Sequence, residues 1–169
     1  AVVAGNACHA AAVKVRDKVI ALRNLAARYE DIPALARGAS LWIARLYQKM
    51  GQDLAAREEY EYLELASGGE PAMLLEARKG LLLAAGRRGD LAASADYLAR
   101  IEDSARELGR LPEMESFRRP WAQALLPAAV SRRAAGNKDD ARAICDFILD
   151  HAPETAEAHA ERVALSATP

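Results

Sequence analysis

The chain has 169 residues, enough for one compact domain or one short helical solenoid. Hydrophobic residues make up 51% and aromatic residues 5%, and because much of the apolar share is alanine, the composition favours helices over sheets. A net charge of −1 and the lack of any run of about 20 apolar residues argue against nucleic-acid binding and membrane insertion.

The first predicted element is a long helix from His9 to Tyr29. Its apolar residues recur every three or four positions, as on one face of a helix. The segment 29–33 ends in Ile-Pro and should break this helix. Before it, the segment 5–8 (Gly-Asn-Ala-Cys) is similar to the end of a bacterial lipoprotein signal, in which Cys8 would be lipidated, although the usual leucine three places earlier is absent. Since the chain begins without methionine, we expect a processed product or an excised fragment.

Three segments then share one pattern, namely a helix, a glycine, one or two polar residues and a second helix. They cover residues 39–63, 75–98 and 121–148. A glycine can adopt the left-handed conformation that ends a helix, and a following side-chain oxygen can cap the next one. The glycines are Gly51, Gly89 and Gly136, and the expected caps are Asp53, Asp90 and Asn137 or Asp139. The pattern therefore predicts an αα-hairpin three times.

Breakers at 67–71 and 109–112 separate these hairpins, and Pro127 should kink the first helix of the third. Residues 154–165 read as a final amphipathic helix that covers the last hairpin. The predicted fold class is all-α, in a single domain. Its parts are an N-terminal capping region (1–36), three repeats (37–70, 71–110 and 111–153) and a C-terminal capping helix (154–169).

These segments resemble the tetratricopeptide repeat family, whose repeats of about 34 residues pair two helices around small residues. The residues that carry the resemblance are Ala44, Tyr47, Gly51, Ala56 and Tyr60 in the first unit, Gly89, Ser94 and Leu98 in the second, and Ala129, Gly136, Ala141, Cys145, Ile148 and Pro153 in the third. The resemblance implies a right-handed αα-hairpin solenoid of about three repeats with capping helices. Spacings of 38 and 47 residues between the three glycines make the connections longer than the family's shortest.

No residue pattern indicates catalysis, a metal or a cofactor. His9, His151 and His159 lack the i, i+4 pairing of a helical metal site, and His151 is expected to interact with a helix dipole. Cys8 and Cys145 form no C-x-x-C pair; Cys145 should be a buried small hydrophobe, and a disulfide would require the two ends to meet. With no nucleophile elbow and no glycine-rich phosphate loop, the chain is predicted not to be an enzyme.

The resemblance also implies a concave groove lined by the first helix of each repeat. The residues expected there are Leu41, Arg45, Gln48, Lys49, Glu76, Lys79, Leu83, Arg87, Gln123, Val130 and Arg133. Because this lining is apolar and basic, it predicts a peptide or protein partner with acidic side chains, held by charge-assisted hydrogen bonds. Trp42 fits either the core or the groove, and Trp121 fits the core better than a partner-binding surface.

Charge is segregated along the chain, with a net +5 over residues 1–52, −5 over 53–75 and −4 over 137–169. Solvated helix faces and alternating charged surfaces both account for this pattern.

The sequence as a whole predicts a non-enzymatic protein-interaction scaffold. One alternative is a homo-oligomeric structural module in which an apolar groove closes against a second copy. Another is an accessory domain of a larger protein, such as an enzyme or an envelope secretion or exopolysaccharide export component. Alanine- and arginine-rich usage and a resemblance to bacterial cell-envelope proteins of this family favour the periplasm or cell envelope over the cytoplasm.

Overall fold

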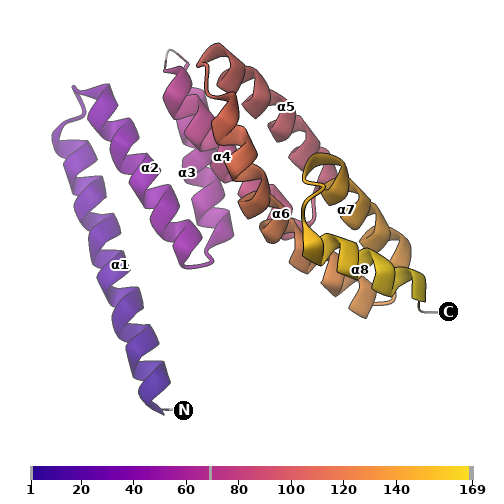
Figure 1. The fold of residues 1–169 in the computed structure, drawn as a ribbon. Helices are drawn as coiled ribbons and strands as arrows, with labels where there is room; N and C mark the ends of the chain where they lie inside the picture. Colours follow the sequence, from indigo (N-terminus) through magenta and orange to yellow (C-terminus); the bar gives the residue numbers. More distant parts are fainter. Residues whose placement is uncertain (1, 69, 168–169) are drawn as a thin grey trace. The chain divides into compact units, whose positions relative to one another are not determined.

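The computed structural model describes residues 2–68 and 70–167, which form eight α-helices and no strand (Figure 1). The side chains of residues 2–12 and of residues 112 and 167 lie outside the described part, so the predictions for Cys8 and His9 do as well. The helices are α1 (Val2–Arg28), α2 (Pro33–Lys49), α3 (Asp53–Ala66), α4 (Pro71–Arg88), α5 (Leu91–Glu107), α6 (Leu111–Ala134), α7 (Lys138–His151) and α8 (Ala156–Ala167). The predicted all-α class is confirmed.

The chain forms two compact units, and the boundary between them falls inside α4, after Gly80. In the first unit, α2 packs against both α1 and α3 (Figure 1). Ala44 of α2 and Ala56 of α3 are almost completely buried, as expected of small residues where two helices pack closely. The first part of α4 lies on α3, where Gly80 meets the ring of Tyr60.

The second unit packs α6 against α5, α7 and α8. Its largest buried side chain is Trp121 of α6, which makes edge-to-face contacts with Phe147 and His151 of α7. The last turns of α4 reach this core, because a Cβ added at Gly86 would lie 3.6 Å from Leu125. The prediction that Trp121 fills core space is confirmed.

The glycine turns of the three predicted hairpins are confirmed. Gly51, Gly89 and Gly136 have φ values of 70°, 69° and 83°, in the left-handed region that favours glycine. Gly109, with φ 67°, makes a fourth such turn between α5 and α6, where the sequence indicated only a break.

One of the predicted helix caps is confirmed. The carboxylate of Asp90 accepts a hydrogen bond from the backbone N–H of Ala93 at 3.0 Å, at the start of α5. The N-cap of α3 is Gln52, so Asp53 is already the first helical residue, and its charge lies in the first turn, at the positive end of the helix dipole. Asn137 is the N-cap of α7 without a side-chain capping bond.

Helix α6 is longer than the predicted first helix of the third hairpin. It begins at Leu111 rather than near Trp121 and continues through Pro120 and Pro127. Each internal proline removes a backbone hydrogen bond, at a cost of about 3 kcal/mol. Packing of α6 against three neighbouring helices supplies the apolar burial that offsets this cost. Helix α2 also starts early, at Pro33, because proline's fixed φ suits the first helical turn.

Candidate functional site

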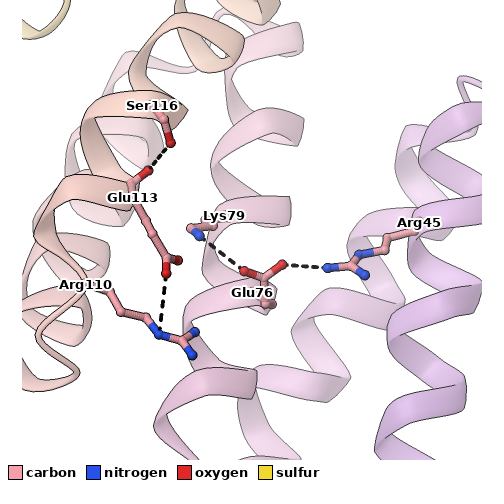
Figure 2. Close-up of polar contacts among 6 residues, drawn as sticks. All are labelled: Arg45, Glu76, Lys79, Arg110, Glu113 and Ser116. Atoms are coloured by element: carbon pink, nitrogen blue, oxygen red, sulfur yellow. Dashed lines mark hydrogen bonds and ion pairs between the residues drawn. The ribbon is translucent and has the colours of Figure 1, made fainter.

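Three of the predicted groove residues form one ion-pair cluster in the first unit. Figure 2 shows Glu76 of α4 between Arg45 of α2 and Lys79, also of α4. Arg45 Nη2 lies 2.6 Å from Glu76 Oε2, and Lys79 Nζ lies 3.2 Å from Glu76 Oε1. The Arg45 guanidinium also lies 5.8 Å from the centroid of the Trp42 ring, which is 57% exposed. Both cations are thus already engaged by one carboxylate, and Trp42 belongs to the surface rather than to the core.

Gln48 contributes to helix packing more than to an open surface. Its Oε1 accepts a hydrogen bond from the Tyr60 hydroxyl at 3.2 Å, which joins α2 to α3. Its Nε2 is buried, with no hydrogen-bond partner among the described atoms. Of its neighbours in the predicted lining, Leu41 is half-buried and Lys49 is exposed.

In the second unit, Arg133 of α6 is bound by Glu161 of α8. Arg133 Nε donates to Glu161 Oε1 at 2.5 Å, and Nη2 donates to Oε2 at 3.3 Å. These hydrogen bonds, with the carboxylate charge, raise the pKa of the Arg133 guanidinium above its ordinary value. A partner carboxylate would therefore have to compete with Glu161 for this arginine.

Gln123 and Val130 share an open groove of about 480 Å³ between α6 and α8. Both side chains are exposed, Val130 at 42%. Five further residues line this α6–α8 groove, namely Leu126, Pro127, Ser131, Ala134 and Glu157. The lining is mostly apolar and holds one carboxylate and no cation. Leu83 and Arg87, predicted to line the same face, lie on α4 outside this groove, half-buried and exposed respectively.

Five of these lining residues were missed in the sequence, namely Leu126, Pro127, Ser131, Ala134 and Glu157. A signal for four of them exists, because they follow Gln123 at steps of three or four along α6 and so share one helix face. Pro127 was considered only as a source of a kink. Glu157 comes from α8, and no local pattern connects it with α6.

The other contacts drawn in Figure 2 stabilise the start of α6 locally. Arg110 Nε lies 3.6 Å from Glu113 Oε1, and the hydroxyl of Ser116 donates to the backbone carbonyl of Glu113 at 2.8 Å. Both contacts join residues close in sequence, so they involve the first turns of the helix and no site.

The described histidines both bond to backbone carbonyls. His151 Nδ1 donates to the carbonyl of Phe147 at 2.9 Å in the last turn of α7, where the dipole interaction was predicted. His159 Nε2 donates to the carbonyl of Pro153 at 2.8 Å. Within residues 2–68 and 70–167, no group of three or more His, Cys, Asp or Glu side chains is arranged to hold a metal ion.

Cys145 is a free thiol buried in the second unit, as its apolar sequence context predicted. Burial raises the pKa of this thiol, and the nearby carboxylates of Glu161 and Asp146 raise it further. A buried thiol with a raised pKa is a poor nucleophile, because little of it is ionised near neutral pH.

No protein-family model, curated protein or solved structure matches this chain. None of the helices in the described part has both the length and the apolarity that crossing a bilayer requires. The geometry of the chain itself is therefore the basis for a functional proposal.

Proposed function

We propose that the chain is a non-enzymatic interaction scaffold of tetratricopeptide-like hairpins, and that it binds a peptide or an extended protein segment in the α6–α8 groove. Three helix–glycine–helix pairs with left-handed glycines support the repeat architecture. The buried small residues Ala44, Ala56, Ala129 and Ala141, at the positions that carry the family resemblance, support it further.

The α6–α8 groove is the single observation that carries the binding proposal. Exposed apolar residues on one face of a helix, gathered in a concave surface, are typical of grooves that accept the apolar anchors of a peptide. Val130 lies within this lining and is 42% exposed, so its methyl groups are available to a ligand. The partner's anchors at this groove are therefore apolar side chains.

Acidic side chains on a partner would bind Arg45 and Lys79 in the first unit and Arg133 in the second. Each of these cations already pairs with Glu76 or Glu161, so a partner carboxylate must exchange with an internal one. Since both the Arg45–Glu76 and Arg133–Glu161 pairs keep one side chain about 40% exposed, such an exchange has a modest net free energy. The acidic groups would then contribute to specificity more than to affinity.

A peptide library displayed on phage and selected on the purified chain tests the proposal. Selected peptides should carry apolar anchors, and Val130→Asp should weaken their binding at least tenfold in fluorescence polarisation. The matched control is Leu65→Asp, because Leu65 lies on α3, is 86% exposed and is far from the groove in sequence. Peptides that bind Val130→Asp as tightly as wild type would contradict the groove as the binding site.

The acidic part of the proposal has its own test. We compare acidic peptides with versions of the same peptides that carry glutamine in place of glutamate. Replacing Arg45, Lys79 and Arg133 together by glutamine should lower the affinity for the acidic peptides more than the affinity for the glutamine versions. Equal losses of affinity for the two peptide series would contradict a role of acidic side chains in binding.

A further inference from the structure

Of the two tryptophans in the chain, one is exposed and lies in a pocket between α1 and α2 of the first unit. Trp42 is 57% exposed, whereas Trp121 is completely buried in the second unit. The pocket, here called the Trp42 pocket, has a volume of about 440 Å³. Its lining consists of one cationic and four apolar side chains, namely Lys18, Ala21 and Leu22 of α1 and Trp42 and Leu46 of α2.

The Trp42 ring is flanked by a cation that is itself bound. The guanidinium of Arg45 lies 5.8 Å from the ring centroid, and its Nη2 lies 2.6 Å from Glu76 Oε2. These contacts restrict the orientation of the ring. A large ring with few free torsions loses little conformational entropy when a ligand covers it, and tryptophan is frequent among the residues that dominate binding. Trp42 therefore offers a preformed surface for an apolar side chain.

Three lysines place positive charge around the Trp42 pocket. Lys18 lines it, and Lys14 lies one turn earlier on the same side of α1. Lys49 lies two turns after Trp42 on the same side of α2. All three lysines are exposed, and among the described side chains none of them has an ion-pair partner. Asp17 is exposed as well, about 100° around α1 from Lys18, so three lysines and one carboxylate leave this surface with a net positive charge.

The lysines gather at one end of the pocket. Helices α1 and α2 pack against each other as an antiparallel pair (Figure 1). Lys14 and Lys18 precede the apolar lining residues of α1, and Lys49 follows those of α2. In an antiparallel pair, positions early in one helix lie beside positions late in the other. A ligand of this pocket would therefore carry its apolar group and its charged groups next to each other.

We propose that the Trp42 pocket binds a peptide segment in which an apolar side chain stands next to glutamate or aspartate. The apolar side chain packs on Trp42 and Leu46, and the neighbouring carboxylates accept charge-assisted hydrogen bonds from the lysines. Positive charge selects acidic peptides over basic ones. The concave pocket selects a single side chain over a flat anionic membrane, which would also meet the exposed carboxylates of Glu30 and Asp31 after α1.

The Trp42 pocket lies in the first unit and the α6–α8 groove in the second, so this inference does not depend on peptide binding in that groove. Exposed lysines contribute little free energy each, because water screens their charge. The affinity should therefore be modest and should fall as salt is added.

Tryptophan fluorescence tests the proposal, because Trp121 is buried and only Trp42 can respond directly to a surface ligand. The probe is a synthetic peptide with a leucine flanked on each side by two glutamates, and its matched versions carry glutamine or lysine in place of glutamate. The acidic peptide should shift the emission to shorter wavelength and protect Trp42 from quenching by acrylamide. It should bind at least about fivefold more tightly than the glutamine version, and the lysine version should bind more weakly still. The same titration of Val130→Asp should give the same shift, which separates this pocket from the α6–α8 groove.

A pair of single-charge variants locates the contact. Lys18→Gln should lower the affinity for the acidic peptide at least about twofold and leave the glutamine version unchanged. Arg16→Gln is the matched control, because Arg16 is exposed on the same helix but lines the pocket on the other side of α1. Circular dichroism checks that both variants keep their helical content.

Three results would overturn the proposal. One is equal affinity for the acidic and glutamine peptides, and another is an equal loss in Lys18→Gln and Arg16→Gln. The third is an emission shift with phosphatidylserine vesicles but not with the acidic peptide, which would assign the surface to a membrane.

Discussion

Replacing Gly80 by alanine should destabilise the chain, although alanine is the better helix former. Gly80 is buried in α4, where a Cβ would lie 2.3 Å from Tyr60 Cζ, 2.4 Å from Cε2 and 2.5 Å from Cε1. Carbon atoms prefer separations of about 3.5–4.0 Å, so the overlap with the ring exceeds about 1 Å. The ring is itself 2% exposed, and its hydroxyl donates to Gln48, so it cannot move without disturbing the α2–α3 packing.

A gain in helix propensity and a loss in packing oppose each other in Gly80→Ala, and their difference decides whether the free energy of unfolding rises or falls. Replacing glycine by alanine in a helix interior raises the free energy of unfolding by about 1 kcal/mol. Overpacking a core lowers it by about 1–3 kcal/mol, and loss of the Tyr60–Gln48 hydrogen bond lowers it by about 1 kcal/mol more. The expected net loss in the free energy of unfolding is about 1–3 kcal/mol, measured by urea denaturation followed by circular dichroism.

The matched control for Gly80→Ala is Gly38→Ala in α2. An added Cβ at Gly38 meets nothing within 4 Å, so only the gain in helix propensity remains, and this variant should be stabilised by up to about 1 kcal/mol. In a Tyr60→Ala background, Gly80→Ala should become stabilising as well, because the ring is gone. If Gly80→Ala stabilises the otherwise wild-type chain as much as Gly38→Ala does, the reasoning is refuted.

Three further predictions concern a turn, a cap and the buried thiol. Gly89→Ala should cost more than Gly51→Ala in thermal melts, because both glycines have positive φ but only at Gly89 does the new Cβ lie 3.0 Å from that of Ala128. Asp90→Ala should lower the free energy of unfolding by about 0.5–2 kcal/mol, because it removes the one capping bond to α5; an unchanged urea midpoint would contradict this. The raised pKa of Cys145 keeps its thiol protonated in the folded chain at a pH where the thiol of the unfolded chain has begun to ionise. The contribution of Cys145 to the free energy of unfolding is therefore complete below about pH 9 and is lost as the pH rises above it. Cys145→Ala should therefore remove part of the alkaline decline in stability, and equal declines in the two proteins between pH 8 and pH 10 would contradict the assignment.

The hairpins were predictable because their determinants are local. A glycine followed by polar residues at the end of an apolar-periodic segment favours the left-handed turn, and Gly51, Gly89 and Gly136 all adopt that turn. Helix ends were less predictable. The start of α6 at Leu111 depends on tertiary packing that supports two internal prolines, which no local propensity reveals.

The charge of the predicted groove could not be read from the sequence, because ion-pair partners lie far apart along the chain. Arg45 pairs with a glutamate 31 residues away, and Arg133 with one 28 residues away. Spacing within one helix identifies which residues share a face, but it does not show which carboxylate another helix brings to that face. The prediction of a basic lining therefore overestimated the free charge of these residues.

The same pairing predicts how peptide binding in the α6–α8 groove responds to salt. The lining of the α6–α8 groove is mostly apolar, and the cations predicted for that face are paired internally, so peptide binding there should depend mainly on buried apolar area. Raising NaCl from about 0.05 M to about 0.5 M shortens the screening length well below 10 Å. Over this range the affinity for a neutral selected peptide should stay within about twofold. A loss of affinity of about tenfold or more over this range would show that charged contacts, rather than buried apolar area, carry the binding.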